Sequence, residues 1–159
     1  MKIRMEVFYM CIVENTVWYR RKQVNLDHKS RDPDALMRSL MQQYVDDSAS
    51  DEFVVHSTSW RYLASGTVML TYIGYSDDLE FGSGPIKKLT LKQLKKINVS
   101  TGEPRSNAGL ERQIVAHAMR HISFLIKTDY AGQFKDAFTP RTRKIFKSLW
   151  SSLAGRVAF

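Results

Sequence analysis

Residues 2–13 begin as an alternation of apolar and polar side chains and then become continuously apolar. Residues 2–7 show the alternation, and residues 7–13 form an unbroken apolar run. Alternation is typical of a half-exposed strand, and an unbroken run of this length is typical of a strand buried on both faces. Glu14-Asn15 provides a turn before residues 16–24, which are rich in β-forming side chains. We therefore expect a β-hairpin.

A helix and a second hairpin follow. Asp32-Pro33 combines an acidic N-cap with a proline at the first helical position. The apolar residues after it fall on one helical stripe, which consists of Leu36, Met37, Leu40, Met41, Tyr44 and Val45. A polar connector over residues 46–51 leads to two strands predicted over residues 52–62 and 67–76.

Helix signals replace strand signals after residue 85. Thr90 and Thr139 are both suited to capping a helix, and a proline follows the second of them. Three helices are predicted, over residues 91–97, 108–127 and 140–153, with a loop over residues 100–107.

Together these patterns predict an α+β fold in a single domain over residues 1–159. Its sheet has four mostly antiparallel strands in the order β-β-α-β-β and is covered by helices, and its C-terminal third is helical and basic. A chain of 159 residues can bury a core without disulfides or a structural metal. The single cysteine, Cys11, lies in an apolar run, so we expect a buried thiol and no disulfide scaffold.

Charge divides the chain into an acidic and a basic part. Residues 86–159 carry fifteen Lys and Arg against four acids, a net charge of +11, whereas residues 1–85 have a net charge of −3. This asymmetry favours a polyanionic or acidic partner for the helical half. Charges near the amino terminus argue against a signal peptide, and no apolar run approaches the ~18 residues of a spanning helix. We therefore expect a cytoplasmic protein without a transmembrane segment.

Nine basic side chains belong to the segments around the short helix and the last helix. Three of them occupy the first turns of the last helix, where positive charge opposes the helix dipole at a cost of about 0.3–1 kcal/mol each. The alternative interpretation is that all nine are solvated and only keep the protein soluble. The residues predicted to contact nucleic acid or an acidic protein surface are Lys87, Lys88, Lys92, Lys95, Lys96, Arg141, Arg143, Lys144 and Lys147.

The second hairpin and the long helix offer an alternative site. Strand alternation places His56, Thr58, Trp60 and Tyr62 on one face and Ser57, Ser59 and Arg61 on the other. His117 and His121 are neighbours on one face of the long helix. The alternative site is a pocket for an anionic ligand, lined by His56, Trp60, Arg61, Tyr72, His117, Arg120 and His121.

The motifs indicate no catalytic residue, metal site or cofactor. His117 and His121 lack both a third ligand and the glutamate of a metalloprotease helix. The serines beside His56 lack the Gly-x-Ser-x-Gly elbow of a serine hydrolase. Gly82-Ser83-Gly84-Pro85 precedes two lysines, but proline has no N–H for a phosphate cradle, so this segment predicts an ordinary loop.

Two segments resemble known proteins. Residues 56–62 with Leu70-Thr71-Tyr72, and residues 116–125, are similar to small uncharacterised cytosolic proteins of cyanobacteria and actinobacteria. The resemblance implies a bacterial cytosolic family and assigns no activity and no functional residue.

The sequence best fits a non-enzymatic binding or regulatory module whose basic helical half docks on nucleic acid or on an acidic protein. The alternative is a small enzyme or ligand-binding protein that uses the pocket between the second hairpin and the long helix. A third hypothesis is binding to a membrane surface by the last helix, with Phe146 and Trp150 opposite its bases.

Overall fold

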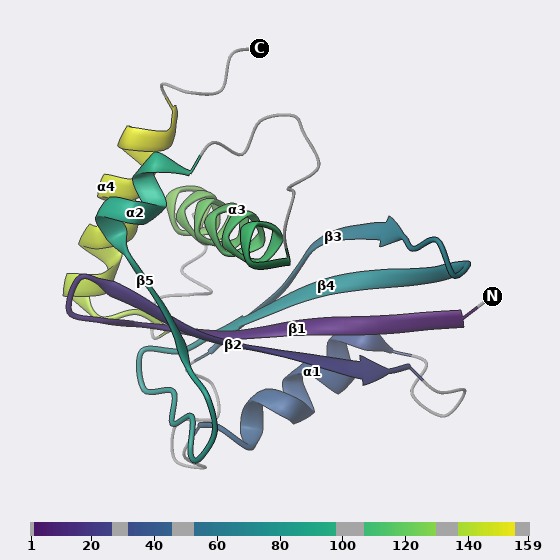
Figure 1. Ribbon diagram of the computed structural model, residues 1–159. Helices are drawn as coiled ribbons and strands as arrows, with labels where there is room; N and C mark the ends of the chain where they lie inside the picture. Colours follow the sequence, from purple (N-terminus) through teal and green to yellow (C-terminus); the bar gives the residue numbers. More distant parts are fainter. Residues whose placement is uncertain (1, 27–31, 46–52, 98–106, 130–136, 155–159) are drawn as a thin grey trace.

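The computed structural model describes residues 2–26, 32–45, 53–97, 107–129 and 137–154. In these residues it shows a mixed five-stranded sheet with helices on both faces, so the predicted α+β class is confirmed (Figure 1). The elements in chain order are β1 (Lys2–Val13), β2 (Thr16–Asn25), α1 (Pro33–Gln42), β3 (Val54–Tyr62), β4 (Thr67–Tyr75), β5 (Lys87–Thr90), α2 (Leu91–Lys96), α3 (Asn107–Thr128) and α4 (Pro140–Ala154).

The strand order across the sheet is β3-β4-β1-β2-β5. Both predicted hairpins form, and α1 connects them so that β1 and β4 lie side by side in parallel. The prediction of four strands is wrong, because Lys87–Thr90 adds a fifth strand that pairs with Thr16–Tyr19. Only Leu89 of β5 is buried, so the segment has too few apolar positions to show a strand pattern by itself.

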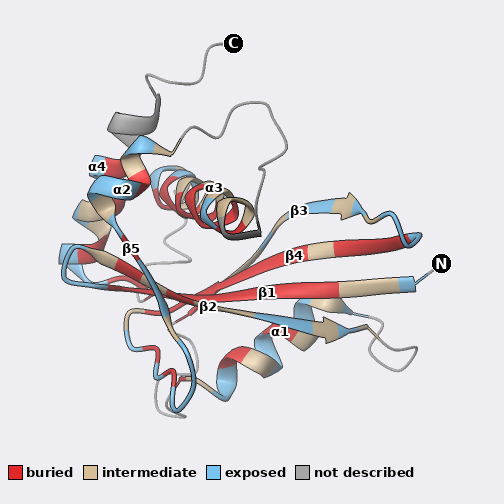
Figure 2. Cartoon of the chain, in the orientation of Figure 1, coloured by how far each residue is buried: buried red, intermediate tan, exposed pale blue. Residues whose placement is uncertain are grey.

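The central strand β1 is buried on both faces, as its apolar run predicts (Figure 2). Phe8, Met10 and Ile12 belong to the core beneath α2, α3 and α4. The alternate residues, which include Tyr9 and the buried thiol of Cys11, belong to a second core beneath α1. The sheet therefore separates two hydrophobic layers.

The second hairpin contains a β-bulge that changes which side chains share a face. Ser57 pairs with Tyr72 and Ser59 pairs with Thr71, so Thr58 is an extra residue between them. As a result His56 and Arg61 lie on the same face of the sheet, toward α3. The simple alternation predicted from the sequence, which separated these two residues, is wrong.

The caps that were predicted for the helices are present in the structure. Asp32 accepts hydrogen bonds from the first turn of α1, and Thr90 forms a capping box with Gln93 at the start of α2. The predicted connector over residues 46–51 lies outside the described residues, as does the loop over residues 100–107 except for Asn107, where α3 begins. No helix in the described ranges has the length and apolar character needed to span a bilayer.

Gly74 of β4 makes room for α1. A Cβ atom at this position would lie 2.2 Å from the sulfur of Met41 and 2.8 Å from the terminal methyl of Met37. Both methionines are fully buried. Close contact between α1 and the sheet therefore depends on the absence of a side chain at residue 74.

We predict that Gly74→Ala lowers the free energy of unfolding by about 1–3 kcal/mol, the usual cost of overpacking a core. Urea denaturation measures the change. Combined with Met41→Ala, the substitution should cost less than the sum of the two single effects, because the new methyl group takes part of the vacated volume. Strict additivity would contradict the proposed contact.

Candidate functional site

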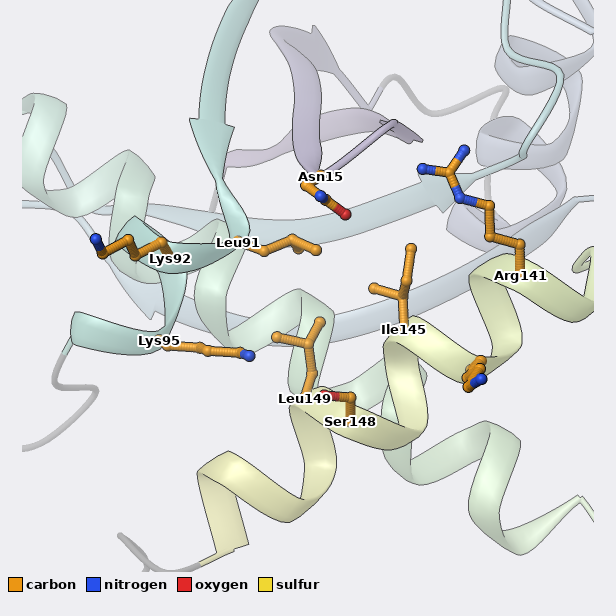
Figure 3. Close-up of a pocket in the computed structure, with 9 residues that line it drawn as sticks. Asn15, Leu91, Lys92, Lys95, Arg141, Ile145, Ser148 and Leu149 are labelled. Atoms are coloured by element: carbon orange, nitrogen blue, oxygen red, sulfur yellow. The ribbon is translucent and has the colours of Figure 1, made fainter.

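A cavity of about 530 Å³ opens where the β1–β2 turn meets α2 and α4 (Figure 3). We call it the basic cavity, because four of the residues that line it are cationic. Its wall consists of Asn15, Leu91, Lys92, Lys95, Arg141, Lys144, Ile145, Ser148 and Leu149.

Local hydrogen bonds place α2 against the β1–β2 turn. The amide of Leu91 donates to the carbonyl of Asn15 at 2.9 Å, at the point where β5 passes directly into α2. The Thr90 capping box fixes the first turn of the helix. Lys92 and Lys95 are three residues apart and therefore lie near each other on its surface.

The flank of α4 that faces the cavity carries both polar or basic side chains and apolar side chains. Arg141, Lys144 and Ser148 recur at spacings of three and four residues, which keeps them on one side of the helix. Ile145 and Leu149 pack against the core and form an apolar floor. In Figure 3 the ammonium of Lys95 extends toward α4, and the guanidinium of Arg141 extends toward the turn that carries Asn15.

The electrostatic character of the cavity is cationic. Lys92, Arg141 and Lys144 are exposed, and none of them forms an ion pair with another described residue. Positive charges that converge on one opening favour a negatively charged ligand. The apolar floor allows part of such a ligand to leave water.

The structure distributes the nine predicted basic residues over several places. Lys92, Lys95, Arg141 and Lys144 line the basic cavity. Arg143 and Lys147 line a second cavity of about 410 Å³, together with Ser123, Ile126 and Lys127 of α3. Lys87 pairs with Glu111, Lys88 lies over the Trp18 ring at 4.2 Å, and Lys96 is exposed without lining any of these cavities.

The first turn of α4 has an acidic partner that the sequence analysis missed. Asp77, just after β4, accepts hydrogen bonds from the Thr139 amide at 2.6 Å and from the Thr142 hydroxyl at 2.9 Å. A carboxylate at this position offsets the positive end of the helix dipole. Asp77 therefore partly offsets the unfavourable interaction between the helix dipole and the basic residues in the first turns of α4.

The three histidines of the alternative pocket do converge. His56 Nε2 lies 3.1 Å from His121 Nδ1, and the ring centres of His117 and His121 are 4.4 Å apart. Burial lowers the pKa of each of the three, to about 4 for His121, where the neighbouring imidazoles lower it further. No group of three or more potential ligand side chains among the described residues has a geometry that could hold a metal ion.

The other members of the alternative pocket do not join the histidines as a single lining. Trp60 and Tyr72 lie on the opposite face of the sheet, where the Tyr72 hydroxyl donates to Asp34 at 2.7 Å. Arg61 shares the histidine face but is bound to Glu6. Arg120 is half-buried on α3, and in the sequence it lies between His117 and His121. The predicted pocket thus divides between two faces of the sheet.

Glu6 is a fully buried carboxylate that the sequence analysis did not single out. It accepts hydrogen bonds from Arg21 at 2.8 and 3.0 Å, from Thr71 at 2.7 Å, and from Arg61. Burial alone would raise the pKa of Glu6, but the hydrogen bonds from Arg61, Thr71 and Arg21 outweigh burial and hold the pKa below its usual value. The sequence signal for this buried carboxylate is its position directly before the unbroken apolar run of residues 7–13.

The sequence matches no protein-family model and no curated protein. The functional argument therefore depends on the residues and their geometry.

We predict that the protein loses stability as the pH falls from about 6.5 to 4.5. The histidine pKa values are lowered in the folded state, so the unfolded chain binds more protons in this window and acid favours unfolding. Replacing His121 by Asn should flatten the pH dependence by about 1–2 kcal/mol, as measured by urea denaturation at each pH. An equally steep profile in this variant would contradict the prediction.

We also predict that Glu6→Gln lowers the free energy of unfolding by about 2–4 kcal/mol, because the two guanidiniums lose their shared counter-charge. Chemical denaturation at neutral pH measures this loss. Glu14→Gln, at an exposed turn position, is the matched control and should change stability by less than about 0.5 kcal/mol. Equal effects of the two substitutions would show that Glu6 has no special role.

Proposed function

We propose that this protein is a polyanion-binding module and that the basic cavity binds the phosphate backbone of a nucleic acid. The observation that carries the proposal is the convergence of Lys92 and Lys95 from α2 with Arg141 and Lys144 from α4 around one opening. These helices are far apart in the chain, so their bases meet only through folding.

Electrostatics supports a phosphate ligand at this site. Phosphate contacts require cations that can reach the ligand, and three of these four side chains are exposed. No carboxylate that would repel an anion is among the described residues that line the cavity. Asn15 and Ser148 add polar groups that can donate hydrogen bonds to phosphate oxygens.

The structure gives less support to the alternative function, a ligand site around the histidines. Arg61, one of the two arginines expected to bind an anion there, already shares the Glu6 carboxylate with Arg21. The membrane hypothesis meets a similar difficulty, because Phe146 is fully buried against Tyr75 and Phe138. The side chain of Trp150 lies outside the described residues.

We predict that a fluorescently labelled oligonucleotide binds the protein with a strong dependence on salt. Four phosphate contacts would make log K fall with log salt at a slope of about −3 to −4, and the sequence of the oligonucleotide should matter little. The triple variant Lys92→Glu, Arg141→Glu, Lys144→Glu should bind at least about a hundredfold more weakly at low salt, as measured by fluorescence anisotropy.

The matched control is Lys2→Glu, Arg38→Glu, Arg112→Glu. It makes the same change in net charge with exposed residues that do not line the basic cavity. Control binding should remain within about threefold of the original. If both triple variants lose affinity equally, binding reflects only net charge and the cavity has no role. If the original protein binds neither DNA nor RNA at low salt, the nucleic-acid proposal fails and an acidic protein surface becomes the partner to test.

A further inference from the structure

Another cationic cavity lies along the other part of β2, where β5 no longer covers the strand. β5 pairs with residues 16–19 only, so β2 continues from Arg20 to Asn25 beyond the last pairing with β5. The segment joining β4 to β5 passes beside the end of α1, and the Glu80 amide donates to the Tyr44 carbonyl at 2.8 Å (Figure 1). The space enclosed here is about 450 Å³, and we call it the β2-edge cavity.

Cations predominate in the wall of the β2-edge cavity. Arg20, Arg21, Lys22 and Lys87 line it, and among the described residues of the wall Glu111 is the only acid. Glu111 pairs with Lys87 and lies 3.9 Å from Arg21, whose other partner is Glu6. Lys22 is exposed and has no ion pair with a described residue. The wall therefore carries positive charge beyond what its own carboxylate neutralises.

Arg20 has a donor that its surroundings leave unsatisfied. Its Nη1 donates to the Phe81 carbonyl at 2.6 Å and its Nε donates to the Pro85 carbonyl at 3.3 Å, which holds the guanidinium over the Phe81 ring. Its Nη2 is buried and has no hydrogen-bond partner among the described residues. A buried N–H of a charged group without an acceptor is costly, and an anion that accepts its hydrogen bond would remove this cost.

Gly84 lies against this donor. A Cβ atom at residue 84 would lie 3.2 Å from Arg20 Nη2, and the backbone there has φ of +118°, which favours glycine. Proline at position 85 removes a backbone N–H, so the segment cannot act as a phosphate loop through its amides.

We propose that the β2-edge cavity binds a small phosphorylated ligand whose phosphate accepts a hydrogen bond from Arg20 Nη2. Lys22 adds a second positive charge beside Arg20, which suits a dianionic phosphate better than a single carboxylate. Tyr19 and Tyr44 line the same space and offer aromatic surface to the remainder of the ligand. The volume lies within the range of cavities that hold small molecules.

Isothermal titration calorimetry with inorganic phosphate and with pyrophosphate tests this proposal, with acetate at matched ionic strength as the comparison. Pyrophosphate should bind more tightly than acetate. Arg20→Lys keeps the charge but removes Nη2, and should weaken pyrophosphate binding by about tenfold.

Lys22→Gln covers the possibility that Arg20→Lys disturbs the fold, because Lys22 is exposed. It should weaken binding by about three- to fivefold. Lys88→Gln is its control, since Lys88 neighbours Lys87 but lies over Trp18, outside the cavity, and it should leave the affinity unchanged. Equal losses in the two glutamine variants, or no pyrophosphate binding at millimolar concentration, would overturn the proposal.

The triple variant of the basic cavity, Lys92→Glu, Arg141→Glu, Lys144→Glu, separates this proposal from the proposed function. It should lose oligonucleotide binding and retain pyrophosphate binding. Loss of pyrophosphate binding in that variant would place the anion in the basic cavity and overturn the assignment to the β2 edge.

Discussion

The buried charge of Glu6 is the constraint on which the arrangement of the sheet depends. A carboxylate with no exposed surface is tolerated only when cations and donors surround it. Here they come from three other strands, Arg21 on β2, Arg61 on β3 and Thr71 on β4. A slip of one residue in any of these strands would turn the partner to the other face. The requirement to neutralise Glu6 therefore selects one register among otherwise similar apolar strands.

The β-bulge at Thr58 follows from the same constraint. Without an extra residue, Arg61 would share a face with Ser57 and point away from Glu6. With it, Arg61 reaches the carboxylate while His56 remains beneath α3 and contacts His121. The histidine cluster is thus a consequence of how the strand satisfies a buried charge. Neutralisation of Glu6 and contact with α3, rather than binding of an anion, account for much of the polar chemistry in the second hairpin.

Features encoded by neighbouring residues were predictable from the sequence, and features that depend on distant contacts were not. Asp32, Thr90 and Thr139 mark helix starts because a cap and its helix are adjacent in the chain. The apolar run of β1 predicts a strand between two layers for a similarly local reason. β5 has only Leu89 as a buried position and exists because β2 offers it an edge. The sequence identifies the nine basic residues as candidates to bind an anion, but which of them share a cavity depends on tertiary packing.

The short length of β5 links the two proposed anion sites. Because the strand ends at Thr90 and passes at once into α2, the lysines of α2 are brought to the β1–β2 turn, opposite the basic flank of α4. Because the strand begins only at Lys87, the part of β2 from Arg20 onward is left open beside Gly84. A longer β5 would extend pairing along β2 and fill the β2-edge cavity, or it would delay the start of α2 and separate its lysines from Arg141. Four residues of strand therefore position two groups of cations at opposite ends of one sheet edge.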